Sequence, residues 1–155
     1  MTTVRDVDKG YAKALKNLFG EKPSLKVGVF GEKAAASHPG TSATVGEIAA
    51  FHEFGTDTIP ERSFLRGWAD EHEGEAAAHL RDLCEKADAG KIDWAVVLDR
   101  FGLWCVAGIQ SRISDNIPPP LADATIARKG SSVALIDTGT LRSSIAHEVT
   151  PDGKP

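Results

Sequence analysis

The sequence predicts an α+β fold in which a small, mostly antiparallel sheet packs against two long antiparallel helices, with a further helix at the N-terminus. Two long stretches with helical periodicity are separated by residues 89–91 alone. One short stretch, residues 24–30, alternates apolar residues with polar or small ones, and a second candidate strand with Ile145 and Val149 lies far along the chain. A connection this short makes neighbouring helices antiparallel, and strict alternation is typical of half-buried strands. We therefore expect helices and strands to share one core.

The first part of the chain predicts a helix, a strand and a loop. Residues 4–19 carry apolar side chains at steps of three and four, and Gly20 follows as a helix stop. Residues 24–30 alternate between apolar side chains and polar or small ones, which predicts a half-buried strand. Residues 31–43 are rich in Gly, Ala, Ser and Pro, and we interpret them as a loop.

A short helix is predicted over residues 44–54. Thr44 is suited to cap its first turn, because a side-chain oxygen at that position can accept a hydrogen bond from a free backbone N–H. A glycine follows the last residue, as expected at the C-terminus of a helix. We expect Val45, Ile48 and Phe51 to form the buried stripe of this helix.

Two long amphipathic helices follow, over residues 64–88 and 92–114. In both, large apolar side chains repeat at helical steps, and the outer face of the first helix carries many carboxylates. Asp93 is placed to cap the second helix, and Asn116 with the three prolines 118–120 ends it. We expect the two helices to cover one face of the sheet.

The last part of the chain is the least regular. Residues 117–139 predict a long mobile loop, with a helical turn or two over residues 121–130. Residues 144–150 predict the final strand, and residues 151–155 predict a frayed tail. Two strands alone make a marginal sheet, so we expect further strands. The stretches where they are expected are 31–45 and 131–137.

Length and composition limit the class of protein. The 155 residues fit a single domain, 1–155, which is long enough to bury a core of its own. Apolar residues make up 41% and charged residues 26%, as in ordinary globular proteins. A net charge of −4 disfavours a general nucleic-acid binder, which would show a basic face. Neither a membrane-spanning stretch nor a signal peptide is evident, so we expect synthesis in a cytoplasm and no membrane contact.

The reactive side chains do not form a known catalytic or metal-binding motif. His72 and His79 lie seven residues apart, whereas zinc ligands on one helix usually lie three or four apart. The sequence contains no HExxH, no G-x-S-x-G and no phosphate-binding glycine motif. Cys84 and Cys105 fall in helical patterns without a CxxC pair, so we expect two reduced thiols. We therefore expect no metal, no cofactor and no enzyme activity.

A few charged and aromatic residues are candidates for intermolecular contacts. Glu53 and Arg62 flank a turn, and two alternatives are open: an intramolecular ion pair that fixes the corner, or contact with a neighbouring subunit. Trp104 lies beside the apolar stripe of its helix, which makes it a candidate subunit contact. Arg128 and Lys129 lie in a small basic stretch, and they are the first residues to examine for contact with DNA.

Two blocks of the sequence resemble a known family. HEFGT begins at His52, and IPERSFLR follows after a short gap and ends at Arg66. A second block, residues 118–149, contains LADATIARKGSS and LIDTGTLRSSI. In this order and at this spacing, the blocks resemble the tail-completion and neck proteins of tailed bacteriophages, in the virion-morphogenesis and minor-tail-protein-Z-like superfamily. Ser63 is a departure, because the family often has a second proline there.

The resemblance implies a structural virion protein and not an enzyme. Proteins of this family form rings in the phage neck, at the head-proximal end of the tail, and complete the tail so that head–tail joining can occur. The implied partners are other copies of the chain and other neck or tail proteins, such as the connector, the tail terminator or the tail tube, with no specific nucleic acid. The implied location is the virion, after synthesis in the cytoplasm of the bacterial host.

The expected contact surface combines the two blocks with the candidates above. It would lie at the corner 52–66 and in the loop 117–139, and a head-to-tail contact whose rotation closes would produce a ring. The residues expected to contact a subunit or partner are His52, Glu53, Phe54, Gly55, Thr56, Arg62, Trp104, Arg128, Lys129, Thr138, Gly139 and Leu141.

Two other functions stay open from the residues themselves. A small hydrolase would use His52, Glu53 and one of the serines, and these side chains would have to converge in a concave pocket. A nucleic-acid-binding regulator would need a basic face, and its affinity would fall steeply as salt is added.

Overall fold

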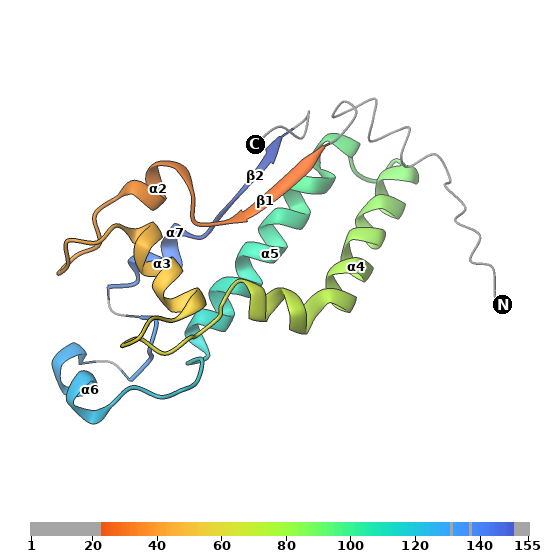
Figure 1. The fold of residues 1–155 in the computed structure, drawn as a ribbon. Coiled ribbons are helices and arrows are strands. Elements are labelled where there is room, and N and C mark those ends of the chain that lie inside the picture. Colours follow the sequence, from red (N-terminus) through yellow and green to blue (C-terminus); the bar gives the residue numbers. More distant parts are fainter. Residues whose placement is uncertain (1–22, 131, 137, 151–155) are drawn as a thin grey trace.

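The computed structural model describes residues 23–130, 132–136 and 138–150. Within these ranges the chain has the α+β architecture that the sequence predicts (Figure 1). The strands are β1 (Ser24–Gly28) and β2 (Ala146–Thr150). The helices are α2 (Gly31–Ala35), α3 (Val45–Phe54), α4 (Arg66–Asp88), the 3-10 helix η1 (Trp94–Val96), α5 (Val97–Ser114), α6 (Asp123–Lys129) and α7 (Thr140–Ser144). The helix predicted over 4–19 and the frayed tail predicted at 151–155 lie outside the described residues.

The sheet joins the two ends of the described chain. β1 and β2 pair antiparallel, and the register runs from Ser24 opposite Thr150 to Gly28 opposite Ala146 (Figure 1). Both predicted strands are confirmed, each with shorter bounds than expected. This pairing brings the first and last strands of the described chain together, although all the described helices lie between them in the sequence.

The expected additional strands are absent from the described residues. In that part of the chain, the only pairing outside the sheet is an isolated bridge between Ser37 and Thr44. The start of the stretch that we interpreted as a loop, 31–43, instead forms α2. Its Glu, Lys and Ala residues favour a helix intrinsically, and the small-residue composition of the whole stretch obscured that preference.

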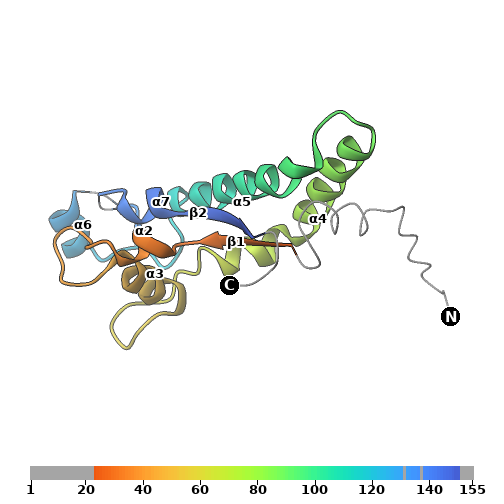
Figure 2. The ribbon, with the colours of Figure 1, turned by 90° about the horizontal axis from the view of Figure 1, so that it is seen from above.

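The two long helices are neighbours, but only one of them lies along the sheet. α4 and α5 pack against each other, as the short connection predicted, and α5 lies against both strands (Figures 1 and 2). The expectation that both helices cover the sheet was therefore wrong. Two glycines on different faces of α5 explain the arrangement. A Cβ at Gly102 would lie 2.5 Å from a ring carbon of His147 in β2, and one at Gly108 would lie 2.5 Å from Nε1 of Trp68 in α4.

The core lies where α3, the start of α4 and the end of α5 meet. The most deeply buried side chains there are Val45, Phe64 and Ile113. A second, smaller cluster at the far end of the helix pair surrounds Leu83 and Val97. α4 bends between the two clusters, because its backbone leaves helical geometry at His72 (φ −115°, ψ 15°). None of the described helices is both long and apolar enough to cross a bilayer.

The two cysteines are free thiols, as expected. Cys105 is buried in the main core, and this burial raises the pKa of its thiol to about 11. Cys84 is half-buried, and burial also raises its pKa. Both thiols are therefore protonated near neutral pH and behave as small apolar side chains.

Of two expectations for α3, the cap at Thr44 is confirmed and the buried stripe was only partly right. The capping box of α3 is complete: the Thr44 hydroxyl accepts from the backbone N–H of Glu47, and the Glu47 carboxylate accepts from the backbone N–H of Thr44. The buried face of α3, however, consists of Val45, Ala49 and Glu53, and Phe51 is partly exposed. The helix is rotated from the predicted stripe so that a carboxylate faces inward.

Candidate functional site

The buried carboxylate of Glu53 caps the first turn of α4. Glu53 is 5% exposed, and its oxygens accept four hydrogen bonds. One comes from the hydroxyl of Ser63 (2.7 Å), and the others come from the backbone N–H groups of Phe64, Leu65 and Arg66 (2.9 Å each). Those N–H groups have no partner within their own helix, and no side chain at the N-cap position bonds to them. A negative charge at a helix N-terminus also opposes the positive end of its dipole.

The geometry of Glu53 limits what its carboxylate can do. A carboxylate has about four lone-pair directions, and here four donors occupy them. The group therefore holds α3 to the start of α4 and has no acceptor direction left for a substrate proton.

The side chain of Arg62 links the corner to a segment far along the chain. It is 4% exposed, and its Nε and Nη2 donate to the carbonyl oxygen of Pro119 at 2.9 Å and 2.7 Å. Its backbone N–H donates to the carbonyl oxygen of His52 at 2.7 Å. Burial lowers the pKa of the guanidinium from its usual value.

The predicted ion pair between Glu53 and Arg62 is not formed among the described residues. Glu53 faces the backbone of α4, and Arg62 faces the backbone of the segment after α5. Each of the two charged side chains binds backbone groups. The position of such groups cannot be read from a pattern of residue types. The intramolecular alternative was right in its purpose, which is to fix the corner, but wrong in its partners.

The turn between α3 and α4 exposes the middle of the first sequence block, from Phe54 to Glu61. Gly55 has a positive φ of 72°, and a Cβ there would lie 3.0 Å from the backbone nitrogen of Glu61, so only glycine fits without strain. The backbone N–H of Thr56 donates to the carbonyl oxygen of Ile59. The hydroxyl of Thr56 accepts from the backbone N–H groups of Thr58 and Ile59. The ring of Phe54, 67% exposed, lies 5.8 Å from the guanidinium carbon of Arg66.

The predicted contact residues of the second block have different surroundings. Thr138 is exposed, and Gly139 precedes α7 with a positive φ of 78°. Leu141 is only 3% exposed and belongs to the main core, so its side chain offers little surface to a partner. Arg128 and Lys129 form the last turn of α6, and their side chains lie outside what the structure describes. The predicted irregular loop thus contains a helix, as 121–130 indicated.

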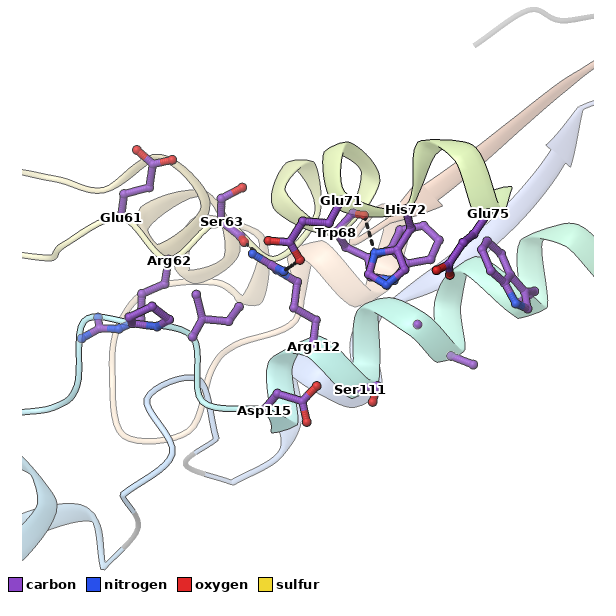
Figure 3. Close-up of a pocket in the computed structure, with 15 residues that line it drawn as sticks. Glu61, Arg62, Ser63, Trp68, Glu71, His72, Glu75, Ser111, Arg112 and Asp115 are labelled. Carbon is purple, nitrogen blue, oxygen red and sulfur yellow. Dashed lines mark hydrogen bonds and ion pairs between the residues drawn. The ribbon is translucent and has the colours of Figure 1, made fainter. Parts of the chain in front are cut away.

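A groove of about 1010 Å³ runs between the start of α4 and the end of α5, and we call it the acidic groove (Figure 3). Arg112 reaches across it from α5, pairs with Glu71, and donates through Nε to the carbonyl oxygen of Ser63 at 3.1 Å. Nδ1 of His72 lies 2.9 Å from the carbonyl oxygen of Trp68. The carboxylates that line the groove are Glu61, Glu71, Glu75 and Asp115.

Trp104 lies in an aromatic cluster between the two long helices. Its ring stacks on His79 with centroids 5.0 Å apart, and meets the edge of Trp68 at 5.2 Å. It is half-buried and lines the acidic groove. Its position beside the apolar stripe, which suggested a subunit contact, follows equally from this intramolecular packing.

A second groove, of about 870 Å³, lies where the two sequence blocks meet, and we call it the Arg62 groove. The first block contributes His52, Pro60 and Arg62, and the second contributes residues 120–122 and 134–135 among others. The structure therefore brings together segments that are far apart in the sequence but carry the same resemblance. The described residues contain no cluster of three or more His, Cys, Asp or Glu side chains that could hold a metal ion.

Three residues of the site were missed by the sequence reasoning. Ser63 donates to Glu53 and accepts from the backbone N–H of Gly67 at 2.9 Å. Arg112 bridges the acidic groove, and Pro119 accepts from Arg62. Of these three residues, only Ser63 could have been noticed in the sequence, because it stands where the family often has proline. Its hydroxyl supplies hydrogen bonds at the start of a helix, which proline cannot do.

Comparison of the chain with protein-family models, with curated proteins and with solved structures finds no significant match.

Proposed function

We propose that this chain is a structural protein of a tailed-bacteriophage virion, which completes the head-proximal end of the tail and supports head–tail joining as a ring. The proposal starts from the two sequence blocks. The observation that supports it most is that Arg62 of the first block bonds to Pro119 of the second. Two segments that carry the resemblance are thus in direct contact in the folded chain.

The use of the charged groups also favours an assembly role. Glu53 and Arg62 are buried and are directed at backbone groups, so they fix the shape of the corner. What the corner presents outward is an aromatic ring at Phe54 and a polar turn that ends at Pro60. Exposed aromatic residues on a rigid frame are typical of protein–protein contacts.

The two alternatives have weaker physical support. In a hydrolase, Glu53 would need a free oxygen to take a proton, and its oxygens already accept four hydrogen bonds. In a nucleic-acid-binding regulator, a basic groove would be expected, but the larger groove is lined by four carboxylates and two arginines. We therefore retain assembly as the conclusion.

Deletion of the gene from the phage or prophage that encodes the chain tests this function. Electron microscopy of lysates should show filled heads and separate tails, and the wild-type gene supplied in trans should restore joined virions. Complete infectious particles after deletion would refute the proposal. Two variants refine the test. Phe54→Ser at the corner should reduce head–tail joining. Leu103→Ser is the control, because it alters an exposed apolar side chain on a different helix, α5, and it should leave joining unchanged.

A further inference from the structure

Arg62 is a buried cation that lacks a counter-charge among the described residues. Its side-chain hydrogen bonds both go to one neutral acceptor, the carbonyl oxygen of Pro119, and no carboxylate of the described chain forms an ion pair with it. Buried charges in proteins are normally paired, because removing a charge from water without compensation is costly. A guanidinium also has five N–H donors, so donors remain after these two bonds.

The two grooves meet at Arg62 and differ sharply in charge. Arg62 lines both of them. The acidic groove carries four carboxylates, whereas the described lining of the Arg62 groove contains none, and Arg62 is its only Lys, Arg, Asp or Glu side chain. In a chain with a net charge of −4, a groove in which a buried guanidinium is the sole formal charge of the described lining favours an anionic group.

The rest of the described lining of the Arg62 groove combines apolar side chains with hydroxyl groups and the imidazole rings of His38 and His52. Its apolar walls include Ile48, Ile59 and Leu121, and its hydroxyls come from Thr41, Thr58 and Thr125. An inorganic anion would gain little from apolar walls. A peptide that places one carboxylate beside an apolar side chain would match both the charge and the walls, and arginine binds carboxylates through two parallel N–H donors.

We propose that the Arg62 groove binds an acidic, apolar segment of a partner protein. One Asp or Glu carboxylate of that segment pairs with the guanidinium of Arg62, and a neighbouring apolar side chain packs against Ile48, Ile59 and Leu121. The pairing supplies the counter-charge that the described chain lacks. This inference does not depend on the partner being a virion protein, so it can hold or fail separately from the proposed function.

Solution NMR of the isotope-labelled chain tests the proposal with three probes. The first is acetyl-Leu-Asp-Leu-amide, the second is its Asn counterpart, and the third is inorganic phosphate. The Asp peptide should shift the backbone N–H signals of Thr41, Thr58 and Thr125 and the Nε–H signal of Arg62. The Asn peptide should bind at least about tenfold more weakly, because it lacks the charge that pairs with arginine. Phosphate should cause no comparable shifts.

Two matched variants separate binding from folding. Thr125→Glu places a carboxylate in the wall of the Arg62 groove and leaves the bonds between Arg62 and Pro119 untouched. It should weaken the Asp peptide at least about tenfold with little change in melting temperature. Ser111→Glu, in the wall of the acidic groove, should leave binding unchanged.

Several outcomes would overturn the proposal. For the peptides, they are equal affinity for the Asp and Asn peptides, or no binding of the Asp peptide at millimolar concentration. For the NMR signals, they are shifts confined to the acidic groove, or shifts with phosphate as large as those with the Asp peptide. For the variants, the outcome is an equal effect of Thr125→Glu and Ser111→Glu on the affinity for the Asp peptide.

Discussion

The guanidinium of Arg62 donates two hydrogen bonds to the carbonyl oxygen of Pro119, which lies 57 residues further along the chain. This contact joins the turn between α3 and α4 to the segment that leaves α5. Glu53 performs the complementary task on the other side, because it joins α3 to the first turn of α4. Two buried charges of opposite sign therefore organise one corner without touching each other.

Replacement of Arg62 by lysine should destabilise the chain. A lysine has no planar fork, so it cannot reproduce both hydrogen bonds to Pro119, and the buried acceptor loses part of its pairing. We expect the free energy of unfolding in urea to fall by about 1–3 kcal/mol. Arg66→Lys is the matched control. Its ion pair with Glu61 is half-exposed, so the loss should be about 0–1 kcal/mol. Equal losses in the two variants would contradict the role given to Arg62.

Glu53→Gln should loosen the start of α4. The amide NH₂ of glutamine would face the hydroxyl of Ser63 or the N–H groups of Phe64, Leu65 and Arg66, which are donors themselves. We expect a loss of about 2 kcal/mol in the free energy of unfolding.

Hydrogen exchange provides a local readout for the same variant. The amide protons of residues 64–66 should exchange faster in Glu53→Gln than in the wild type. Glu61→Gln, which alters an exposed carboxylate nearby, should leave their exchange unchanged. Unchanged protection in Glu53→Gln would mean that the carboxylate does not hold these groups.

Gly108→Ala should separate the two long helices. The added Cβ would lie 2.5 Å from Nε1 of Trp68, so the helix pair must shift or the indole must move. Overpacking of this kind costs about 1–3 kcal/mol in the free energy of unfolding. Gly74→Ala is the control, because a Cβ at that helical position meets nothing within 4 Å, and it should stabilise by about 0.5–1 kcal/mol. The same sign of change in both variants would contradict the packing described here.

Alkaline pH should destabilise the fold through Cys105. Burial raises the pKa of this thiol from 9.0 to about 11 in the folded state. Between these values the unfolded chain has released the proton and the folded chain still holds it. The unfolded state then binds fewer protons, so the stability must fall as the pH rises. The free energy of unfolding, measured from about pH 8 to about pH 10.5, should fall less steeply in Cys105→Ala than in the wild type. Parallel curves would rule out this contribution.

The sequence was most informative where local chemistry decides the structure. Thr44 forms the cap predicted for α3, Gly55 takes the backbone geometry that ends it, and the short connection after α4 makes α4 and α5 neighbours. These features depend on side chains and on residues next to them in the chain. The strand β1 could be predicted for the same reason, because alternation is a local pattern, and β2 was predicted from the spacing of Ile145 and Val149.

The parts that could not be predicted depend on tertiary contacts. The inward face of α3 includes Glu53 because N–H groups at the start of α4 lie beside it, and backbone donors leave no trace in a pattern of residue types. Arg62 was expected to pair with Glu53 across the turn or to contact a neighbouring subunit, whereas its partner is a carbonyl oxygen far along the chain. Only α5 lies along the sheet, and this arrangement depends on the close approaches at Gly102 and Gly108. The periodicity of the sequence does not reveal such approaches.

Cryo-electron microscopy of the virion produced by the phage or prophage that encodes this chain tests the central proposal most directly. We predict a closed ring of copies at the head-proximal end of the tail, into which the described part of the chain fits as a unit with the corner at residues 52–66 against a neighbouring subunit. Intact virions in which the chain is absent from the neck and tail would contradict the account.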